Sequence, residues 1–242
     1  MNLIVDIGNS RVKISIFNGD VIVKQDSLVN PTKESISKFC SGFSIQNAII
    51  SSVSEDVLQI IESVSSLCVN CILLDENTAL PIDNIYKNPK TLGRDRIAAA
   101  VGANEIFPNQ NVLIIDAGTA ITIDIVTDKN QYLGGNISPG LNTRFKSLHN
   151  YTNKLPLLES KNTWSIVGND TESAIIAGVQ QGVIFEIEGY ISYFKTLYET
   201  ISVLITGGDA ECIAKHLNHN VIVEPYLVLK GLNRIVLYNA NN

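Results

Sequence analysis

Two short stretches of the sequence carry an aspartate and a glycine at a spacing that suits phosphate binding. Residues 3–17 read LIVDIGNSRVKISIF, and residues 113–126 read LIIDAGTAITIDIV. In each, an apolar strand ends in Asp, a Gly follows two residues later, and a second strand alternates apolar and polar residues. The pattern predicts two β-hairpins, each with one buried face and a glycine in the turn, although the two turns differ in length by one residue.

The chemistry of such a turn follows from its glycine and its aspartate. A glycine has no Cβ, so the backbone N–H groups of the turn can wrap around phosphate oxygens. The aspartate can hold a hydrated Mg²⁺ or a monovalent ion beside those oxygens. Asn9, Ser10 and Thr119 add short donors, and Lys13 can add a positive charge.

A third glycine-rich turn, Thr206 to Asp209, follows a strand expected at 203–205 and precedes a helix expected at 210–217. A strand, a Gly-rich turn and a helix in this order are typical of α/β proteins that hold a nucleotide. One D-x-G turn alone is more often an ordinary hairpin turn. The nucleotide prediction therefore depends on finding all three turns in this order.

A different cluster, Leu92-Gly93-Arg94-Asp95-Arg96, opens an alanine-rich helix expected over 95–107. An Asp at a helix start is most often a cap, and arginines beside it most often lie at the surface. The arginines could instead bind a carboxylate or a transferring phosphate bidentately. Asp95 could accept the proton of a substrate hydroxyl during phosphoryl transfer. The residues alone leave both interpretations open.

The rest of the chain alternates between strand and helix patterns. Two like hairpins half a chain apart predict a duplicated α/β fold, with an N-terminal lobe over 1–110 and a C-terminal lobe over 111–242. A long helical pattern over 171–198 carries Gly178, Gly182 and Gly189 and is expected as one helix or two. Those glycines permit close helix packing either across a dimer or within one subunit. Further segments are a strand at 48–53 and a helix at 56–64.

Composition excludes several classes of protein. Of the 242 residues, 45% are apolar and only 17% are charged, with a net charge of −6 and scattered lysines and arginines, which disfavours a nucleic-acid binder. No apolar run reaches the ~18–20 residues that span a bilayer, and the N-terminus lacks the basic region of a signal peptide. We expect a cytoplasmic protein that does not bind a membrane.

Four cysteines without a secretory signal are expected as reduced thiols. Cys68 and Cys71 form a CxxC pair, but no second pair of zinc ligands follows. Cys71 leads into residues 72–74, which read as a buried strand rather than as the helix that a thioredoxin-like motif would open. We therefore expect a structural role for this pair.

Taken together, these motifs resemble those of type III pantothenate kinases. The resemblance rests on D-x-G-N-S-x-x-K from Asp6, on G-x-D-R from Gly93 and on D-x-G-T from Asp116. It extends through Gly134-Gly135-Asn136-Ile137-Ser138-Pro139-Gly140, the Thr152-to-Pro156 segment and Thr171, and so covers nearly the whole chain. Departures are small: Ser10 stands where Thr is more usual, and Thr152 to Pro156 varies a segment that more often has Ala after Thr.

The resemblance implies two ribonuclease-H-like lobes of the actin-like ATPase superfamily, with a nucleotide cleft between them. It implies ATP-dependent phosphorylation of pantothenate to 4′-phosphopantothenate, the first step of coenzyme A biosynthesis, by a homodimer that uses Mg²⁺ with ATP and a monovalent cation, K⁺ or NH₄⁺. The implied ATP contacts are Asp6, Ile7, Gly8, Asn9, Ser10, Arg11, Val12, Lys13 and Thr119. The implied pantothenate contacts are Tyr86, Gly93, Arg94, Asp95, Arg96 and Thr171, with Asp95 as general base and Asp116 as cation ligand.

The residues are also compatible with other functions. Tyr86 taken alone would more often be a packing residue, and Asp116 could be a second Mg²⁺ partner. Another small-molecule kinase of the superfamily is possible, although those chains are usually longer and lack the G-x-D-R segment. A nucleotide-binding regulatory accessory protein and an actin-like filament protein share the fold class. The presence of both Asp6 and Asp95 favours an enzyme.

Overall fold

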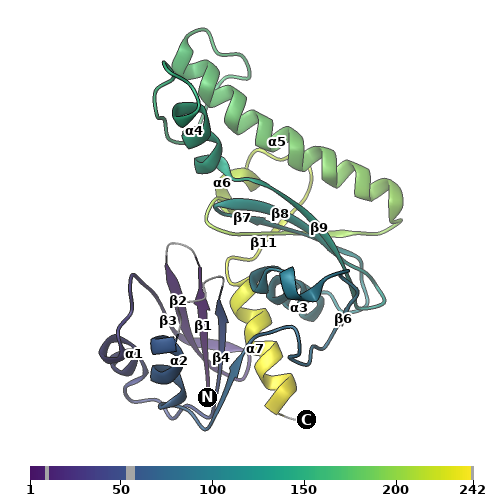
Figure 1. Cartoon of the computed structure of the whole chain (residues 1–242). Coiled ribbons are helices and arrows are strands. Elements are labelled where there is room, and N and C mark those ends of the chain that lie inside the picture. The colour runs from purple at the N-terminus through teal and green to yellow at the C-terminus, as the bar shows by residue number, and fades with distance from the viewer. Residues whose placement is uncertain (9–10, 53–57, 241–242) are drawn as a thin grey trace. The chain divides into compact units, whose positions relative to one another are not determined.

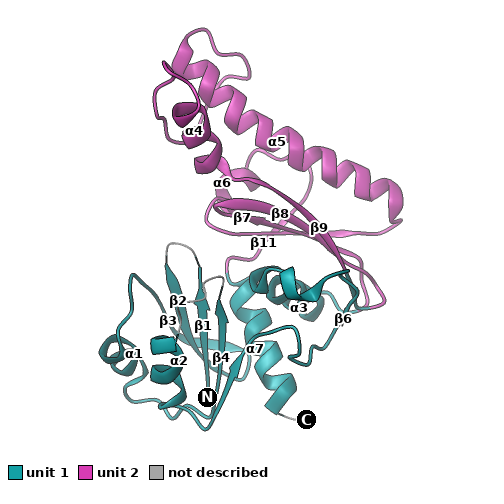
Figure 2. Cartoon of the chain, in the orientation of Figure 1, with its two compact units in different colours: residues 1–108, 130–132, 226–242 teal, residues 109–129, 133–225 magenta. Residues whose placement is uncertain are grey.

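The computed structural model describes residues 1–8, 11–52 and 58–240, which divide into two compact units (Figures 1 and 2). Unit 1 contains residues 1–108, 130–132 and 226–242, and unit 2 contains residues 109–129 and 133–225. The first change of unit falls after Pro108, two residues before the end that was predicted for the N-terminal lobe. The C-terminal residues differ from the prediction, because the last helix packs with the N-terminal segment rather than with residues 111–225.

Unit 1 is built on a five-stranded sheet of order β3-β2-β1-β4-β5. Strand β1 pairs antiparallel with β2 and parallel with β4, and β4 pairs parallel with β5. The strands are β1 (Asn2–Ile7), β2 (Val12–Asn18), β3 (Val21–Leu28), β4 (Asn47–Ser52) and β5 (Asn70–Leu73). The helical segments are α1 (Lys33–Cys40), α2 (Leu58–Ser65), η1 (Pro89–Thr91), α3 (Arg94–Ile106) and α7 (Leu227–Ala240).

The central strands of unit 1 are covered on both faces. On one face, Leu3, Val5 and Ile50 join a core with residues of α1 and α2. On the other face, α7 packs on β1 and β4. It also packs along α3, so closely that a Cβ on Gly231 would lie 1.8 Å from the carbonyl oxygen of Ala98. Strands buried on both faces must be apolar throughout, as β1 is.

Unit 2 holds most of a six-stranded sheet of order β11-β10-β7-β8-β9-β6. Its strands β7 (Val112–Ala117) and β8 (Ala120–Val126) form the second hairpin, and β10 pairs parallel with β7. The others are β9 (Gln131–Pro139), β10 (Ser202–Thr206), β11 (Ile222–Val223) and, from unit 1, the short β6 (Asp83–Asn84). The helices are α4 (Leu141–Asn150), α5 (Thr171–Leu197) and α6 (Ala210–Ala214), and α4 and α5 enclose the core of this unit with β7 and β8.

Most predicted elements are present, with informative differences. Both hairpins form, but Ser15 and Asp124, expected on open faces, are buried. Ser15 pairs with Ile4 on the face of the sheet that α7 covers, which explains its burial. Helix α5 runs for 27 residues without a break, and α6 ends at Ala214, before the predicted 217.

The strands and the second helix of unit 1 also differ in detail from the predicted ones. The predicted strand at 48–53 is β4, whose described part ends at Ser52, and α2 is described from Leu58 on. Strand β5 lies at a sheet edge and is largely exposed. Of the buried strand expected at 72–74, Ile72 is partly buried, Leu73 is exposed, and Leu74, just after the strand, is buried. Within the described part of the chain, no helix is both long and apolar enough to cross a bilayer.

Candidate functional site

In unit 1, the first predicted phosphate hairpin places the Asp6 carboxyl group at the end of β1. Asp6 is partly buried and pairs across the sheet with Lys13 on β2 and with Ser51 on β4. The N–H of Gly8 donates to the carbonyl oxygen of Arg11 at 3.1 Å and closes the turn. Asn9 and Ser10, also predicted to bind ATP, lie outside the described residues. Lys13 and Arg11 are exposed, as side chains that meet a charged ligand must be.

The Asp6 carboxyl group is held away from water, and its acidity reflects this. Burial raises the pKa of Asp6 from 3.8 to about 6. Lys13 and the Ser51 hydroxyl lower this pKa in part, whereas the nearby negative charge of Asp95 raises it further. Asp6 and Asp95 are therefore close enough to interact, which brings together two residues that lie far apart in the sequence.

Asp95 lies in the first turn of α3, after the N-cap residue Gly93. Its Oδ1 accepts a hydrogen bond of 2.8 Å from the N–H of Arg96, and Gly93 provides no side-chain cap. A Cβ at position 93 would lie 2.5 Å from Asp95 Oδ1, so a larger residue there would displace the carboxylate. A carboxylate that accepts this bond from the neighbouring N–H still has lone pairs that can accept a substrate proton.

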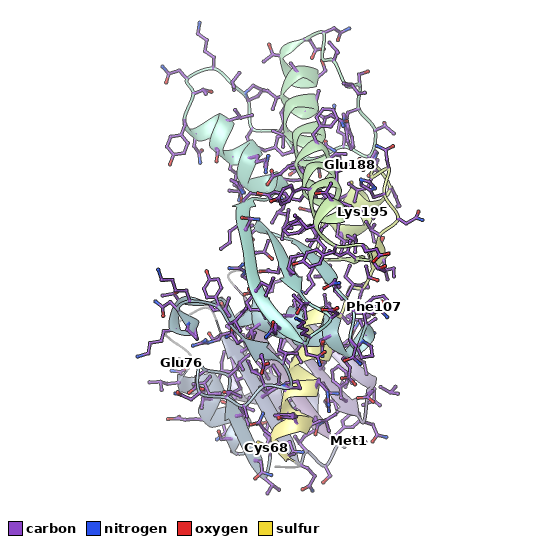
Figure 3. All side chains as sticks on the ribbon, turned by 90° about the vertical axis from the view of Figure 1, so that its right-hand side faces the viewer. Met1, Cys68, Glu76, Phe107, Glu188 and Lys195 are labelled. Carbon is purple, nitrogen blue, oxygen red and sulfur yellow. The ribbon has the colours of Figure 1, made fainter. Side chains whose placement is uncertain are left out.

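The other predicted pantothenate ligands of unit 1 surround the start of α3. The guanidinium carbon of the buried Arg96 lies 5.7 Å from the centroid of the Tyr86 ring. The Tyr86 ring is in turn tilted by 35° against the Tyr132 ring, with the ring centroids 6.2 Å apart. Arg94 is engaged differently: it forms an ion pair of 2.9 Å with Glu76, which Figure 3 labels. It also donates to the carbonyl oxygen of Pro89 at 3.3 Å. Of the two arginines, Arg96 is the one packed beside Tyr86.

In unit 2, two glycines from other motifs hold the second hairpin turn. A Cβ on Gly140 would lie 2.0 Å from the carbonyl oxygen of Gly118. Gly207 has φ +97°, and a Cβ there would lie 2.4 Å from the carbonyl oxygen of Ala117 and 2.6 Å from Asp116 Oδ1. Only residues without a side chain fit at both positions. The predicted second and third turns are thus packed against each other in the same unit.

Hydrogen bonds reinforce this packing. The carbonyl oxygen of Thr119 accepts from the N–H of Gly140 at 3.0 Å and from the hydroxyl of Thr143 at 2.6 Å. The N–H of Asp209 donates to the carbonyl oxygen of Ala117 at 3.0 Å. The Thr119 side chain is exposed. A rigid turn with an exposed hydroxyl can donate hydrogen bonds to a phosphate without the entropy cost of ordering a flexible loop on binding.

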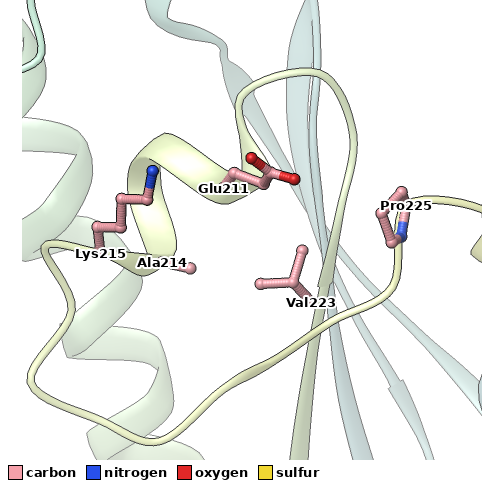
Figure 4. A pocket seen from close by; sticks show the side chains of 5 residues that line it. All are labelled: Glu211, Ala214, Lys215, Val223 and Pro225. Atoms are coloured by element: carbon pink, nitrogen blue, oxygen red, sulfur yellow. The ribbon is translucent and has the colours of Figure 1, made fainter.

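Helix α6 follows the third turn and borders an open pocket of about 430 Å³ (Figure 4). The pocket is lined by Glu211, Ala214, Lys215, Val223 and Pro225. Glu211 comes from α6 and Lys215 follows directly after it, whereas Val223 and Pro225 supply apolar surface on the side of β11. Asp209 at the start of α6 is half-buried, and burial raises the pKa of its carboxyl group.

Thr171, the remaining predicted ligand, is the first residue of α5 and belongs to unit 2. The side chain of the preceding Asp170 caps the helix by accepting from the N–H of Ser173 at 2.7 Å. The Thr171 side chain is exposed and is not used for capping. It is therefore available to a ligand at the helix start.

Metal binding can be judged from the carboxylates. No group of three or more His, Cys, Asp or Glu side chains able to hold a metal ion is found among the residues that the structure describes. Asp6 and Asp116 each offer a single carboxylate at a strand end. Mg²⁺ in kinases is usually held by one or two carboxylates together with substrate phosphates, so the donor set fits a metal that arrives with ATP.

Both a family model and individual proteins are similar to this chain over most of its length. A model of the type III pantothenate kinase family matches residues 2–193. A type III pantothenate kinase from Bacteroides fragilis (strain YCH46) is 41% identical over 239 residues, which are 99% of this chain and 98% of that protein. This chain belongs to the type III pantothenate kinase family. The resemblance predicted from the motifs is confirmed.

Solved structures agree on the fold. A Campylobacter jejuni protein ascribed to a Baf family of transcriptional activators has a TM-score of 0.67 and 26% identity, and covers 99% of this chain and 100% of its own. A Listeria monocytogenes protein ascribed an N-acetylmannosamine kinase activity has a TM-score of 0.57 at 11% identity, and covers 99% of each chain. The two-lobed α/β fold of the actin-like ATPases and sugar kinases is thus confirmed for this family member.

Two contributions to these sites were missed in the sequence. Ser51, in register with Asp6, is the second-last residue of β4 and carried no motif. Arg144 donates to the carbonyl oxygen of Pro139 at 2.7 Å and pairs with Glu186, so it ties the Gly-rich segment to α5. The sequence did offer a signal for Arg144: it stands four residues after Gly140, in the first turn of the helix that follows the Gly-rich segment. A side chain in that turn can reach back to the segment before the helix.

The packing of the second hairpin predicts unequal effects of two neighbouring substitutions. Gly207→Ala should lower the free energy of unfolding by about 2–4 kcal/mol, because the φ of residue 207 is positive and the added Cβ would overlap the Ala117 carbonyl oxygen. Gly208→Ala is the matched control, since no atom lies within 4 Å of its Cβ, and should change stability by less than ~0.5 kcal/mol. Urea unfolding measures both; equal effects would contradict the packing.

The raised pKa of Asp6 predicts a stability that depends on pH. The folded state disfavours the ionised form of Asp6, so ionisation of Asp6 lowers the free energy of unfolding. This loss of stability is complete above the folded pKa near 6 and absent below the unfolded pKa near 3.8. Asp6→Asn should therefore raise the free energy of unfolding by roughly 1–3 kcal/mol at pH 7.5, and the gain should vanish near pH 4. Asp20→Asn, in an exposed turn, is the control. A gain for Asp6→Asn that does not change with pH would refute this explanation.

Proposed function

We propose that this protein transfers the γ-phosphoryl group of ATP to the primary hydroxyl of pantothenate, giving 4′-phosphopantothenate and ADP. Membership of the type III pantothenate kinase family, at 41% identity over nearly the whole chain, supports the reaction and its place as the first step of coenzyme A biosynthesis. The observation that carries the proposal is the arrangement of Asp95 beside Asp6, with Arg96 against Tyr86, in one unit of a family member.

Asp95 is proposed as the general base. Its carboxylate would accept the hydroxyl proton of pantothenate as the hydroxyl oxygen bonds to the γ-phosphorus and the bond to the ADP oxygen breaks. Its position in the first turn of α3 and the hydrogen bond that its Oδ1 accepts from the adjacent Arg96 N–H support this role. Tyr86, Gly93 and Arg96 are proposed to position the substrate. Arg94 can contribute only by exchanging its ion pair with Glu76 for the substrate.

ATP is proposed to contact Asp6 to Lys13 and Thr119, and Thr171 is proposed to bind pantothenate. The closed turns at Gly8 and Gly118 and the exposed Lys13 and Thr119 support the ATP contacts. The turn from Thr206 to Asp209 and the pocket beside α6 are proposed to support the adenosine. Mg²⁺, when bound with ATP, neutralises charge on the phosphates. An enzyme that uses ATP in coenzyme A synthesis is expected in the cytoplasm.

A nucleotide-binding regulatory protein of the same fold is the second candidate. The likeness to the Campylobacter jejuni protein, which is ascribed to transcriptional activators, favours it. The presence of Asp6 and Asp95 at their expected strand and helix ends favours the kinase instead. The two functions differ in whether pantothenate stimulates turnover of ATP.

The kinase proposal is tested by ADP release from ATP with Mg²⁺ and potassium, with and without pantothenate. We expect pantothenate to stimulate release, and Asp95→Asn to lower kcat by roughly two to four orders of magnitude with an unchanged unfolding curve. ATP binding without stimulation by pantothenate would support the regulatory candidate. A variant with near-normal kcat would show that Asp95 only stabilises the start of α3.

We propose further that Asp116 binds a monovalent cation. Asp116 is partly buried near the end of β7, and a Cβ on Gly207 of the third turn would lie 2.6 Å from its Oδ1. A carboxylate near ATP phosphates needs a cation between them, because like charges repel strongly where water is partly excluded. Carboxylate and backbone carbonyl oxygens suit K⁺ or NH₄⁺.

Kinase activity should therefore require potassium or ammonium, and sodium should substitute poorly. Asp116→Asn should raise the potassium concentration needed for half-maximal activity or abolish ATP binding. Activity is measured against KCl, with the ionic strength held constant by a large organic cation. Full activity without potassium would remove the cation site and leave Asp116 as a Mg²⁺ partner.

A homodimer is proposed, with α5 as the contact. Gly178, Gly182, Phe185, Gly189 and Tyr193 recur at helical spacing on one stripe of α5. Nothing within the described chain lies within 4 Å of a Cβ at any of these three glycines, so helix packing inside the subunit does not explain them. Phe185 and Tyr193 are 62% and 58% exposed. An apolar stripe with small residues suits a second copy of the same helix.

Phe185→Glu should shift the protein from dimer to monomer in sedimentation-velocity experiments, because it introduces a charge into that contact. Lys195→Gln, on the same helix but away from the stripe, is the control and should leave the dimer intact. Dimers that persist in Phe185→Glu would mean that another surface makes the contact.

A further inference from the structure

Two thiols in unit 1 lie on either side of a bend. Cys68 follows the turn at the end of α2, and Cys71 lies in β5. Between them the chain bends sharply, because the N–H groups of Val69 and Asn70 both donate to the carbonyl oxygen of Gln46, at 3.0 and 2.9 Å. The bend keeps the two thiols near enough for Cys71 to affect the ionisation of Cys68. Cysteines on either side of so short a bend can be joined by a disulfide where their Cβ atoms approach to about 4 Å.

The two thiols differ in their surroundings. Cys71 is exposed, whereas Cys68 is partly buried, packs against the core beneath the sheet and donates to the carbonyl oxygen of Val64 at 3.4 Å. Burial, and to a smaller extent the neighbouring Cys71, raise the pKa of Cys68 to about 12. Cys68 therefore keeps its proton, whereas the Cys71 thiol meets solvent. An exposed thiol near a partly buried, protonated thiol is the arrangement of an attacking and a resolving thiol.

The proposed kinase chemistry makes no use of this pair. Cys71 is in register with Ala48 of β4, which pairs with Leu3, whereas Asp6 lies three residues further along β1 toward the opposite end of the sheet. Figure 3 places Cys68 at the end of unit 1 that also holds Met1. A metal site is not supported either, since no third ligand completes a group among the described residues.

We propose that Cys68 and Cys71 form a dithiol site that reacts with low-molecular-weight disulfides. The Cys71 thiolate attacks one sulfur of the external disulfide, forms a mixed disulfide and releases the other sulfur as a thiol. Cys68 then loses its proton and attacks the Cys71 sulfur, and the second external thiol leaves with that proton. Two protein thiols are oxidised to one disulfide, and one external disulfide is reduced to two thiols.

The test uses the intact protein and glutathione disulfide as the probe. The protein is equilibrated in buffers of rising ratio of oxidised to reduced glutathione, quenched with an alkylating agent and analysed by mass. We expect one transition in which two of the four cysteines lose their reactivity together. The tryptic peptide of residues 39–87 should become lighter by two hydrogen atoms, without a glutathione adduct.

Substitutions assign the bond and keep the proposal falsifiable. Cys71→Ser, at an exposed position, should abolish the paired loss of thiols, and Cys68→Ala should accumulate one glutathione on Cys71. Cys40→Ser and Cys212→Ser are the matched controls and should leave the transition unchanged. The proposal is overturned if the wild type accumulates a glutathione adduct without losing a second thiol. It is also overturned if Cys40→Ser abolishes the transition.

Discussion

The burial of the Asp6 carboxyl group is the constraint on which the rest of unit 1 depends. The apolar strand β1 holds this carboxyl group where little water reaches it, and the loss of hydration raises the pKa of Asp6 to about 6. Lys13 and Ser51, from the two neighbouring strands, lower that pKa only in part, and Asp95 at the start of α3 raises it. Two carboxylates in such a place favour the approach of cations. The geometry thus suits a metal-bound polyphosphate and a hydroxyl that must lose its proton.

Unit 2 repeats the hairpin but supports it by different means. The turn after Asp116 is packed between Gly140 and Gly207, which come from two other motifs. Three segments that are separate in the sequence therefore form one rigid surface, and a side chain at either glycine would push it apart. The duplicated hairpin places an aspartate near a strand end in both units. In unit 1 the neighbour of this carboxylate is a second acid, Asp95, whereas in unit 2 the carboxylate of Asp116 lies beside the backbone of Gly207.

Sequence patterns predicted the two hairpins, α3 and the third turn, because each is a local feature with its own period or turn residue. Contacts between segments were beyond reach: nothing in the local pattern around residue 231 shows that α7 returns to pack on β1 and β4. The exposure of β5 was also mispredicted, since an apolar run does not reveal whether its strand lies at the edge of a sheet. The electrostatic influence of Asp95 on Asp6 has no signal in the local sequence around either residue, and the Arg94–Glu76 ion pair had none either.

The coupling of Asp6 and Asp95 can be measured directly by following the side-chain carboxyl carbons of both residues by NMR as a function of pH. The account predicts that Asp6 titrates with a midpoint near pH 6, and that this midpoint falls in Asp95→Asn because a neighbouring negative charge has been removed. A midpoint near the ordinary value of 3.8 in both proteins would contradict it. The two carboxylates would then be independent groups, and the arrangement proposed to carry the kinase reaction would not exist.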